Sequence, residues 1–208
     1  MESALREGGR QPGLRLIETM LWDGERFPRI LLHIERLRRS RQRLGWARPG
    51  GEFDWDCDVA LPAVPARVRL TVDAAGAAEW QVADLPPARA EWRVGPAAAA
   101  VCSGDPWLTV KSTRREAQDA ARAALAPGLD EVLFLNERGE VTEGTITTVF
   151  FDRGQGMRTP PLSSGLLPGV LRAELGCPEE VLRAEDLPQV RLWVGNALRG
   201  LIPAVWAG

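Results

Sequence analysis

A stretch rich in proline and alanine interrupts the chain near its middle and limits which folds it can adopt. Residues 85–106 contain four prolines, two glycines and many alanines. This composition is typical of an edge segment that passes into a linker. Strand-type and helix-type patterns occur on both sides of it. The chain is long enough to bury a core, and we expect two domains, residues 1–98 and 99–208.

The first domain combines strands with one long helix. Strand-type runs occupy residues 14–22, 66–73 and 79–83. The turn signal Asp23-Gly24 follows the first run and suggests a hairpin. Apolar residues at helical spacing predict a helix from Ile30 to Leu44, which Gly45 ends.

The second domain begins with a strand-to-helix turn. Residues 107–110 form a short β-type run, and Thr113 with Glu116 forms a capping-box pattern that opens a helix running to Leu125. Two strands at 131–135 and 141–151 flank the turn 136–139, which predicts a hairpin.

Two further elements follow the hairpin. Pro168 and Gly169 introduce a helix through Leu175, and residues 191–194 form a short buried strand.

Lysine is almost absent. The chain has 26 lysines and arginines together, and Lys111 is its one lysine. Arginine replaces lysine on a surface, but not where an amine must lose its proton and attack a carbonyl. Lys111 is therefore either a chance survivor on the surface or the site of such chemistry.

Three other groups are candidates for binding or catalysis. His33, the only histidine, and Arg36 lie one turn apart and form either a solvated basic face or an anion site. Glu143 lies in a predicted strand and either faces solvent or pairs with a buried cation such as a pyridinium nitrogen. Gly169 precedes a helix whose N-terminus favours phosphate, although glycine is common there. Together the four groups supply what pyridoxal phosphate requires.

Composition narrows the class of protein. A net charge of −2 and arginines interleaved with acids give no sign of a nucleic-acid partner. Three cysteines without metal-ligand spacing suggest neither disulfides nor a metal site. The charged N-terminus and the lack of an 18-residue apolar run predict a cytoplasmic protein with no membrane partner.

The chain resembles the class IV aminotransferases, the pyridoxal phosphate enzymes of fold type IV. The matching stretches are LIETM at 16–20, HIERLRRS at 33–40, KSTRR at 111–115, DEVLFLNERGEVTEGTI at 130–146, TPPLSSGLLPGVLRAEL at 159–175 and VGNALRGLIPA at 194–204. Within the family they are most similar to aminodeoxychorismate lyase. The resemblance implies an α+β fold with a small N-terminal α/β domain and a larger C-terminal domain built on a β-barrel-like sheet, and a homodimer.

The resemblance also implies roles for individual residues. Lys111 falls on the lysine that forms the Schiff base with pyridoxal phosphate, Arg36 on the phosphate-binding arginine, and Glu143 on the acid beside the pyridine nitrogen. Thr19 falls on a threonine close to the substrate in the lyase. The other implied contacts are Val170, Leu171, Asn196 and Ala197 with phosphate, Thr147 with the ring, and Arg114, Arg115 and Arg199 with substrate carboxylates.

Two departures from the family pattern bear on the activity. Thr148 stands where the family commonly has asparagine, and the chain contains no tyrosine, although many relatives place one beside the cofactor. The expected function is a 4-amino-4-deoxychorismate lyase that forms 4-aminobenzoate and pyruvate for folate biosynthesis. The alternatives are an aminotransferase for branched-chain or D-amino acids, and a non-catalytic binding protein on the same fold.

Overall fold

The computed structural model describes residues 2–46, 55, 57 and 59–208. Its contacts divide the chain into two units, one of Met1–Pro87 with Val110–Arg114 and one of Ala88–Thr109 with Arg115–Gly208. This division begins earlier than the predicted one after residue 98, and it returns the short segment with Lys111 to the first unit. Within the described residues, no helix is long and apolar enough to cross a membrane.

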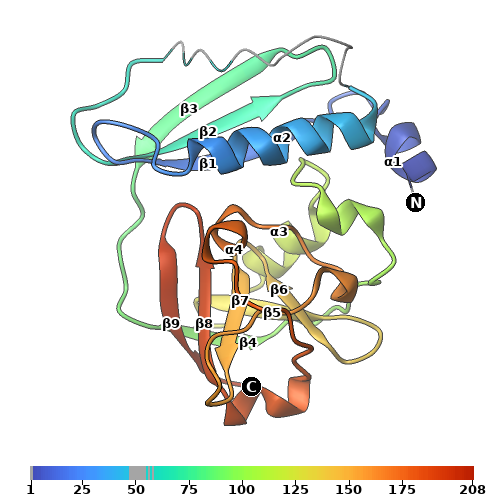
Figure 1. The fold of residues 1–208 in the computed structure, drawn as a ribbon, viewed down its shortest axis with the longest axis vertical. Coiled ribbons are helices and arrows are strands. Elements are labelled where there is room, and N and C mark those ends of the chain that lie inside the picture. Colours follow the sequence, from blue (N-terminus) through green and yellow to red (C-terminus); the bar gives the residue numbers. More distant parts are fainter. Residues whose placement is uncertain (1, 47–54, 56, 58) are drawn as a thin grey trace. The chain divides into compact units, whose positions relative to one another are not determined.

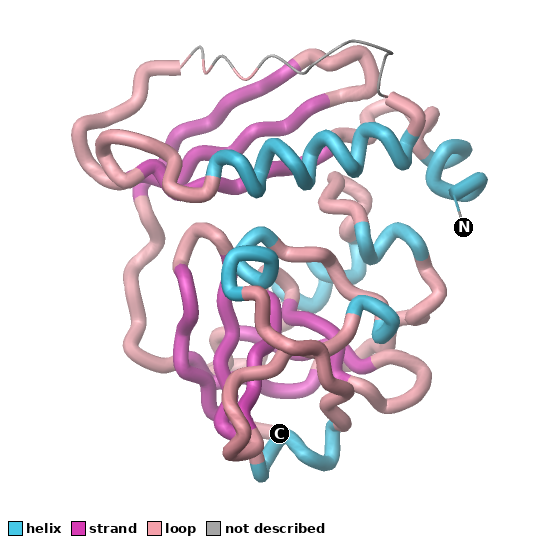
Figure 2. The backbone as a smooth tube through the Cα atoms, in the orientation of Figure 1, coloured by secondary structure: helices cyan, strands magenta, loops and turns pink. Residues whose placement is uncertain are grey.

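The first unit is a three-stranded antiparallel sheet with a long helix on one face (Figures 1 and 2). Its elements are α1 (Glu2–Gly8), β1 (Leu16–Trp22), α2 (Ile30–Leu44), β2 (Ala66–Val72) and β3 (Ala78–Asp84). Strand β2 lies between β1 and β3, and Thr19 of β1 pairs with Arg69 of β2. Alternation along the strands gives the two sheet faces different side chains.

Helix α2 has the predicted bounds, and Gly45 ends it with a φ of 74°, which a glycine adopts without strain. Its buried face agrees in part with the predicted apolar stripe, since Leu37 and Leu44 are buried. Ile30 and Ile34 are only half-buried, whereas His33 and Arg36 are buried. The reason lies on β1, where a buried carboxylate faces the helix.

The prediction of a hairpin at Asp23-Gly24 is wrong. A turn does form there, since the Asp23 carboxylate accepts the backbone N–H groups of Glu25 and Arg26. The chain then enters α2, and β1 finds its partner in β2 instead. A local turn signal therefore did not determine which strand pairs next.

The second unit is a closed six-stranded barrel, which confirms the barrel-like sheet implied by the family resemblance. Its strands are β4 (Trp92–Pro96), β5 (Glu131–Leu135), β6 (Val141–Gly144), β7 (Thr148–Asp152), β8 (Arg191–Asn196) and β9 (Gly200–Trp206). Strand β4 pairs in parallel with both β5 and β9 and closes the barrel, whereas the other neighbours are antiparallel. Its helices are α3 (Glu116–Ala123), α4 (Val170–Leu175) and the 3-10 turns η1 (Pro106–Thr109), η2 (Leu162–Ser164) and η3 (Ala184–Gln189).

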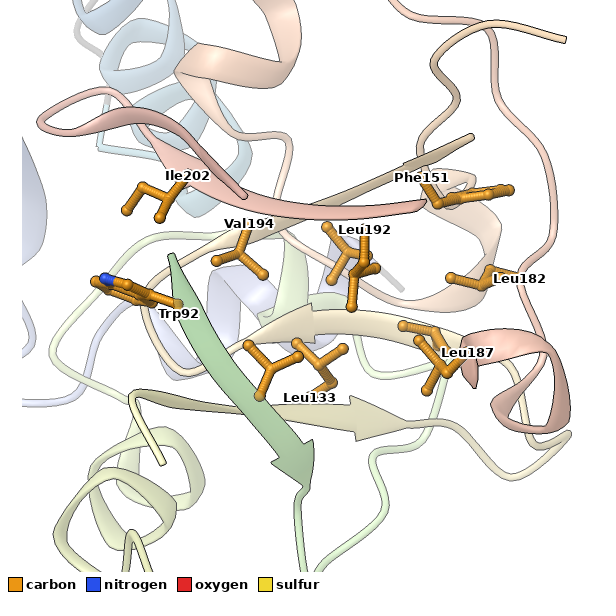
Figure 3. Packing of buried hydrophobic residues seen from close by; sticks show 11 residues of the cluster. Trp92, Leu133, Phe151, Leu182, Leu187, Leu192, Val194 and Ile202 are labelled. Carbon is orange, nitrogen blue, oxygen red and sulfur yellow. The ribbon is translucent and has the colours of Figure 1, made fainter. Parts of the chain in front are cut away.

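The barrel core is built from large apolar side chains of several strands. Trp92, Leu133, Phe151 and Val194 pack together with Leu182 and Leu187 (Figure 3). Burying such side chains stabilises the fold by about 1.5–3 kcal/mol each relative to exposure. All six barrel strands contribute to this core, so it holds in place the strands that carry or flank candidate site residues of this unit.

The hairpin of β5 and β6 confirms the predicted turn. Gly139 has a φ of 72°, and its N–H donates to the carbonyl of Asn136 at 3.0 Å. Helix α4 also begins and ends close to where the sequence predicted.

Other local predictions are wrong. The proline-rich stretch contains barrel strand β4, because Trp92 and Val94 point into the core. The run 107–110 overlaps the 3-10 turn η1, in which the Asp105 carboxylate accepts the N–H of Trp107. The predicted strand 141–151 is divided into β6 and β7.

The prediction of a capping box at Thr113 and Glu116 is also wrong. Thr113 exchanges backbone and side-chain hydrogen bonds with Arg15, its hydroxyl accepting the Arg15 N–H at 3.0 Å. That hydroxyl is therefore used at the edge of β1. Helix α3 begins later, at Glu116, and ends at Ala123 before the predicted Leu125.

Candidate active site

Lys111 lies on the open edge of β1. Its carbonyl accepts the N–H of Ile17 at 2.9 Å, and Ser112 forms a bridge with Leu16. The segment therefore continues the first unit's sheet by a few residues, although the chain on either side belongs to the second unit. Main-chain hydrogen bonds to a buried strand fix the backbone that carries the amine.

A buried carboxylate stands next to this edge. Glu18 of β1 is 2% exposed and faces α2, where it accepts hydrogen bonds from His33 and Arg36. The Nδ1 atom of His33 lies 2.6 Å from Oε2, and Nε of Arg36 lies 2.9 Å from Oε1. A second Arg36 nitrogen, Nη2, also contacts Oε2. An ionised carboxylate can only accept, so Nδ1 of His33 carries its proton here.

Opposing effects set the charge states of this cluster. Burial raises the pKa of Glu18, but the Arg36 guanidinium and the hydrogen bonds from His33 and Arg36 outweigh it and lower that pKa to about 2. Burial also lowers the pKa of His33. The charges of Arg36 and Lys111 lower this pKa further, whereas the hydrogen bond and the charge of Glu18 raise it. Glu18 is therefore ionised, His33 neutral and Arg36 charged near pH 7.

The sequence singled out His33 and Arg36 but missed Glu18. The signal was available, because a single acid in the strand-type run LIETM lies among apolar residues. A buried cation on the facing helix needs such a partner. The solvated basic face considered for His33 and Arg36 is wrong, since the two side chains are 1% and 5% exposed.

Thr19 lies on the opposite face of the sheet from Glu18. Its cross-strand partner is Arg69, and the same face carries Arg15, which binds the hydroxyl of Thr71 through Nε at 2.9 Å. Thr19 and Arg69 thus present a hydroxyl and a cation side by side. Arg69 was not identified from the sequence, where it is one arginine among many.

In the second unit, Glu143 lies at the end of β6 opposite Thr148 of β7. Its side chain is half-buried, and Oε2 accepts the N–H of Leu167 at 3.2 Å. The Glu143 carboxylate therefore contacts the segment that leads into α4. The alternative of a fully solvent-facing carboxylate does not hold.

The start of α4 packs closely on two strands. A Cβ on Gly169 would lie 2.7 Å from Oγ1 of Thr148, and one on Gly195 would lie 2.6 Å from Cδ2 of Leu171. These distances leave no room for side chains at either glycine. The start of α4 is thereby held against β7 and β8, and β8 ends at Asn196, directly before Ala197.

The turn between β6 and β7 is fixed from two sides. Thr147 donates its hydroxyl to Glu131 at 3.0 Å, and the amide of Asn196 donates to the carbonyl of Ile146 at 3.1 Å. The Asn196 side chain also accepts the N–H groups of Leu198 and Arg199. Thr147, Asn196 and the start of α4 are thus brought together within the second unit.

The three candidate arginines for substrate differ in their surroundings. Arg114 is exposed in the first unit. Arg115 binds Asp119 at 2.7 Å and the carbonyl of Thr145 at 3.3 Å, and the guanidinium of Arg199 lies 5.3 Å from the ring centre of buried Trp92. Arg115 and Arg199 both belong to the second unit.

The residues present fit a phosphorylated pyridine aldehyde. The Glu18 carboxylate fixes Arg36 through Nε and Nη2, and among the described residues Nη1 has no protein acceptor, which leaves it for an anion. Gly169 and Gly195 let the start of α4 approach β7 and β8 closely, and the backbone N–H groups there would suit a phosphate. In the first unit Lys111 carries an amine, and in the second unit Glu143 carries an acid that would suit a ring nitrogen.

Comparisons with known proteins identify the family. A family model described as amino-transferase class IV matches residues 15–205. A proposed aminodeoxychorismate lyase from Schizosaccharomyces pombe is 31% identical over 168 residues, which are 77% of this chain and 72% of that protein.

Solved structures show the same fold. A proposed amino-acid aminotransferase from Mesorhizobium loti is 38% identical with a TM-score of 0.83, covering 93% of this chain and 100% of that one. A proposed 4-amino-4-deoxychorismate lyase from Legionella pneumophila has a TM-score of 0.77 at 20% identity, covering 92% and 82%. The family match covers most of the chain, and the fold type IV architecture agrees with it. The chain therefore belongs to the class IV aminotransferase family, whose enzymes use pyridoxal phosphate.

Proposed function

We propose that the protein is a pyridoxal phosphate enzyme that acts as a 4-amino-4-deoxychorismate lyase. When bound, the cofactor supplies an aldehyde for an amine and a ring that withdraws electrons from the bond being broken. Arg36 would hold the phosphate, together with the backbone N–H groups of Val170 and Leu171 and the loop of Asn196 and Ala197. Glu143 would hold the proton on the ring nitrogen, and Thr147 would contact the ring.

Lys111 has two roles in this proposal. Its Nζ atom would anchor the cofactor and would accept the proton from the substrate carbon that carries the amine. The hydroxyl of Thr19, or Nζ of Lys111, then delivers a proton as pyruvate leaves. The ring that remains becomes aromatic, which drives the reaction to 4-aminobenzoate.

The observation that supports the lyase best is the pairing of Thr19 with Arg69 on one sheet face. A hydroxyl that moves protons and a cation that binds carboxylates suit a substrate with several carboxylates. We therefore add Arg69 to Arg114, Arg115 and Arg199 as a candidate for substrate carboxylates. The relative from Schizosaccharomyces pombe, a proposed aminodeoxychorismate lyase, supports the same choice.

The alternative is an aminotransferase for branched-chain or D-amino acids. It is supported by the 38% identity to the proposed amino-acid aminotransferase from Mesorhizobium loti. In this reaction Nζ of Lys111 would move the proton taken from the substrate carbon, and the product would be a 2-oxo acid. The third hypothesis is a non-catalytic binding protein on the same fold. It requires that pyridoxal phosphate does not bind.

The test supplies purified protein with pyridoxal phosphate and measures products. We expect 4-aminobenzoate and pyruvate in equal amounts from aminodeoxychorismate, and no turnover of an amino acid with 2-oxoglutarate. The opposite result favours the aminotransferase. Loss of the lyase products in T19V, with cofactor absorbance unchanged, checks the role of the hydroxyl.

A further inference from the structure

Glu131 is a buried acid that none of the assigned roles uses. It lies at the start of β5, is 0% exposed, and points at the turn between β6 and β7. An ionised carboxylate is rarely buried without several donors. Its surroundings therefore indicate what it holds.

Four donors converge on this carboxylate. Oε1 accepts the hydroxyl of Thr145 at 2.6 Å and the N–H of Val132 at 3.1 Å. Oε2 accepts the hydroxyl of Thr147 at 3.0 Å and the N–H of Ile146 at 3.2 Å. Three of these donors belong to consecutive residues, so one carboxylate sets the conformation of the whole turn.

Charge and space around Glu131 fit this role. Nη1 of Arg122 lies 3.5 Å from Oε1 and partly compensates the buried charge. Gly144 allows the close approach, because a Cβ there would lie 2.8 Å from Cδ of Glu131. The turn cannot move toward Glu131, and moving away would break three hydrogen bonds at once.

The turn connects groups that we assign to the cofactor. It is separated from Glu143 by Gly144 alone, it contains Thr147, and its Ile146 carbonyl accepts a hydrogen bond from Asn196. All these contacts lie within the second unit. Displacement of the turn would therefore change the positions of the acid, the ring contact and the phosphate loop together.

We propose that Glu131 is a positioning residue, which fixes the turn 145–147 and thereby aligns Glu143, Thr147 and Asn196 toward pyridoxal phosphate. This rests on the proposed cofactor site. Glu131 acts through other residues and does not itself take part in the chemistry. Its effect is thus expected on cofactor binding as well as on turnover.

The first test uses E131Q in the cofactor-free protein. An amide offers one acceptor oxygen where the carboxylate offered two, so a turn N–H or hydroxyl loses its partner. We expect amide hydrogen exchange of residues 144–148 to increase at least tenfold. E140Q is the matched control, because Glu140 is a buried acid bound by Asn136, Arg138 and Ser164 instead.

The second test titrates pyridoxal phosphate into the same proteins. We expect the dissociation constant to rise about tenfold in E131Q and to change little in E140Q. T145V removes one donor and should reproduce part of the effect, whereas T145S keeps the hydroxyl and should restore binding. In the double variant E131Q/T145V, the two effects should add only in part, because both substitutions act on the same set of hydrogen bonds to residue 131.

The outcomes distinguish failure of the positioning role of Glu131 from failure of the proposed pyridoxal phosphate function. If wild type binds the cofactor, and E131Q and T145V bind it equally well with unchanged exchange in the turn, the role of Glu131 is wrong. If wild type does not bind the cofactor, the proposed function fails, and increased exchange in E131Q would then leave Glu131 as a support of the turn alone. If E131Q does not fold, T145V against T145S decides the question.

Discussion

At the scale of single residues, the cluster of Glu18, His33 and Arg36 determines whether the first unit can hold an anion. Arg36 is buried, and its charge is tolerated because Glu18 is ionised beside it. The same ion pair fixes the guanidinium before any ligand arrives. Preorganisation of this kind reduces the cost of ordering a side chain on binding.

Removing the charge of Glu18 should destabilise the first unit strongly. E18Q leaves the buried Arg36 without a full partner, and breaking such a pair costs about 3–5 kcal/mol. Chemical denaturation of E18Q against wild type measures the loss in unfolding free energy. E35Q is the control, since Glu35 pairs with Arg38 and Arg39 at the surface and should change that free energy by less than about 1 kcal/mol. Equal losses in the two variants would contradict the account.

Acid should act on this cluster in two steps. Burial lowers the pKa of His33 from its ordinary value of 6.5, so the unfolded chain takes up a proton first as pH falls below 6.5, and unfolding free energy decreases. Glu18, whose pKa is lowered from 4.5 to about 2, should add a second decrease below pH 4.5. Unfolding free energy measured from pH 7 to 5 checks the first step.

The chain has one histidine, which provides a control for that profile. H33Q should be flat across the upper part of this range while wild type declines. If wild type is also flat between pH 6.5 and 5, neutral burial of His33 is wrong.

At the scale of elements, the start of α4 depends on a glycine for space rather than for backbone conformation. Gly169 has a φ of −66°, which alanine also adopts. G169A should still lower unfolding free energy by about 1–3 kcal/mol, because the new methyl group overlaps Oγ1 of Thr148. Thermal unfolding measures this, with G104A as a control whose Cβ meets nothing closer than 3.9 Å.

A second substitution checks the cause of that loss. T148A removes the overlapping hydroxyl, so it should recover much of the stability of G169A. If G169A/T148A loses as much unfolding free energy as G169A and T148A lose together, the contact between Thr148 and Gly169 does not limit the packing.

Elements with strong local signals were predictable from the sequence. Helix α2 and the β5–β6 hairpin have clear periodicity, a glycine at the required positive φ, and short-range contacts. Elements that depend on distant partners were not predictable. Strand β4 is a strand because two remote strands pair with it, and Thr113 does not cap α3 because it bonds Arg15.

The residues of the candidate site likewise divide into those that the sequence predicted and those that it did not. Lys111, Arg36 and Glu143 were identified by residue type and family resemblance, whereas Glu18 and Glu131 were missed. Each missed acid lies in an apolar strand, where a carboxylate looks like a lone exception until its donors are known. Those donors come from other elements, at positions that sequence spacing does not reveal.

At the scale of the whole molecule, the proposed site residues are divided between two units. Lys111, Arg36 and Thr19 belong to the first unit, and Glu143, Thr147 and the phosphate loops belong to the second. Cofactor binding should raise the melting temperature of the protein, because a ligand that binds only the folded chain stabilises it. The homodimer and the cytoplasmic location stay predictions, the first of which sedimentation can test.

The central claim is that pyridoxal phosphate attaches to the one lysine of the chain. The most direct measurement is borohydride reduction of the protein with the cofactor, followed by peptide mass spectrometry. We expect the mass of the reduced cofactor on the peptide that contains Lys111, and no such mass in K111A. Unmodified Lys111 in a protein saturated with cofactor, or modification at the N-terminal amine alone, would contradict the account.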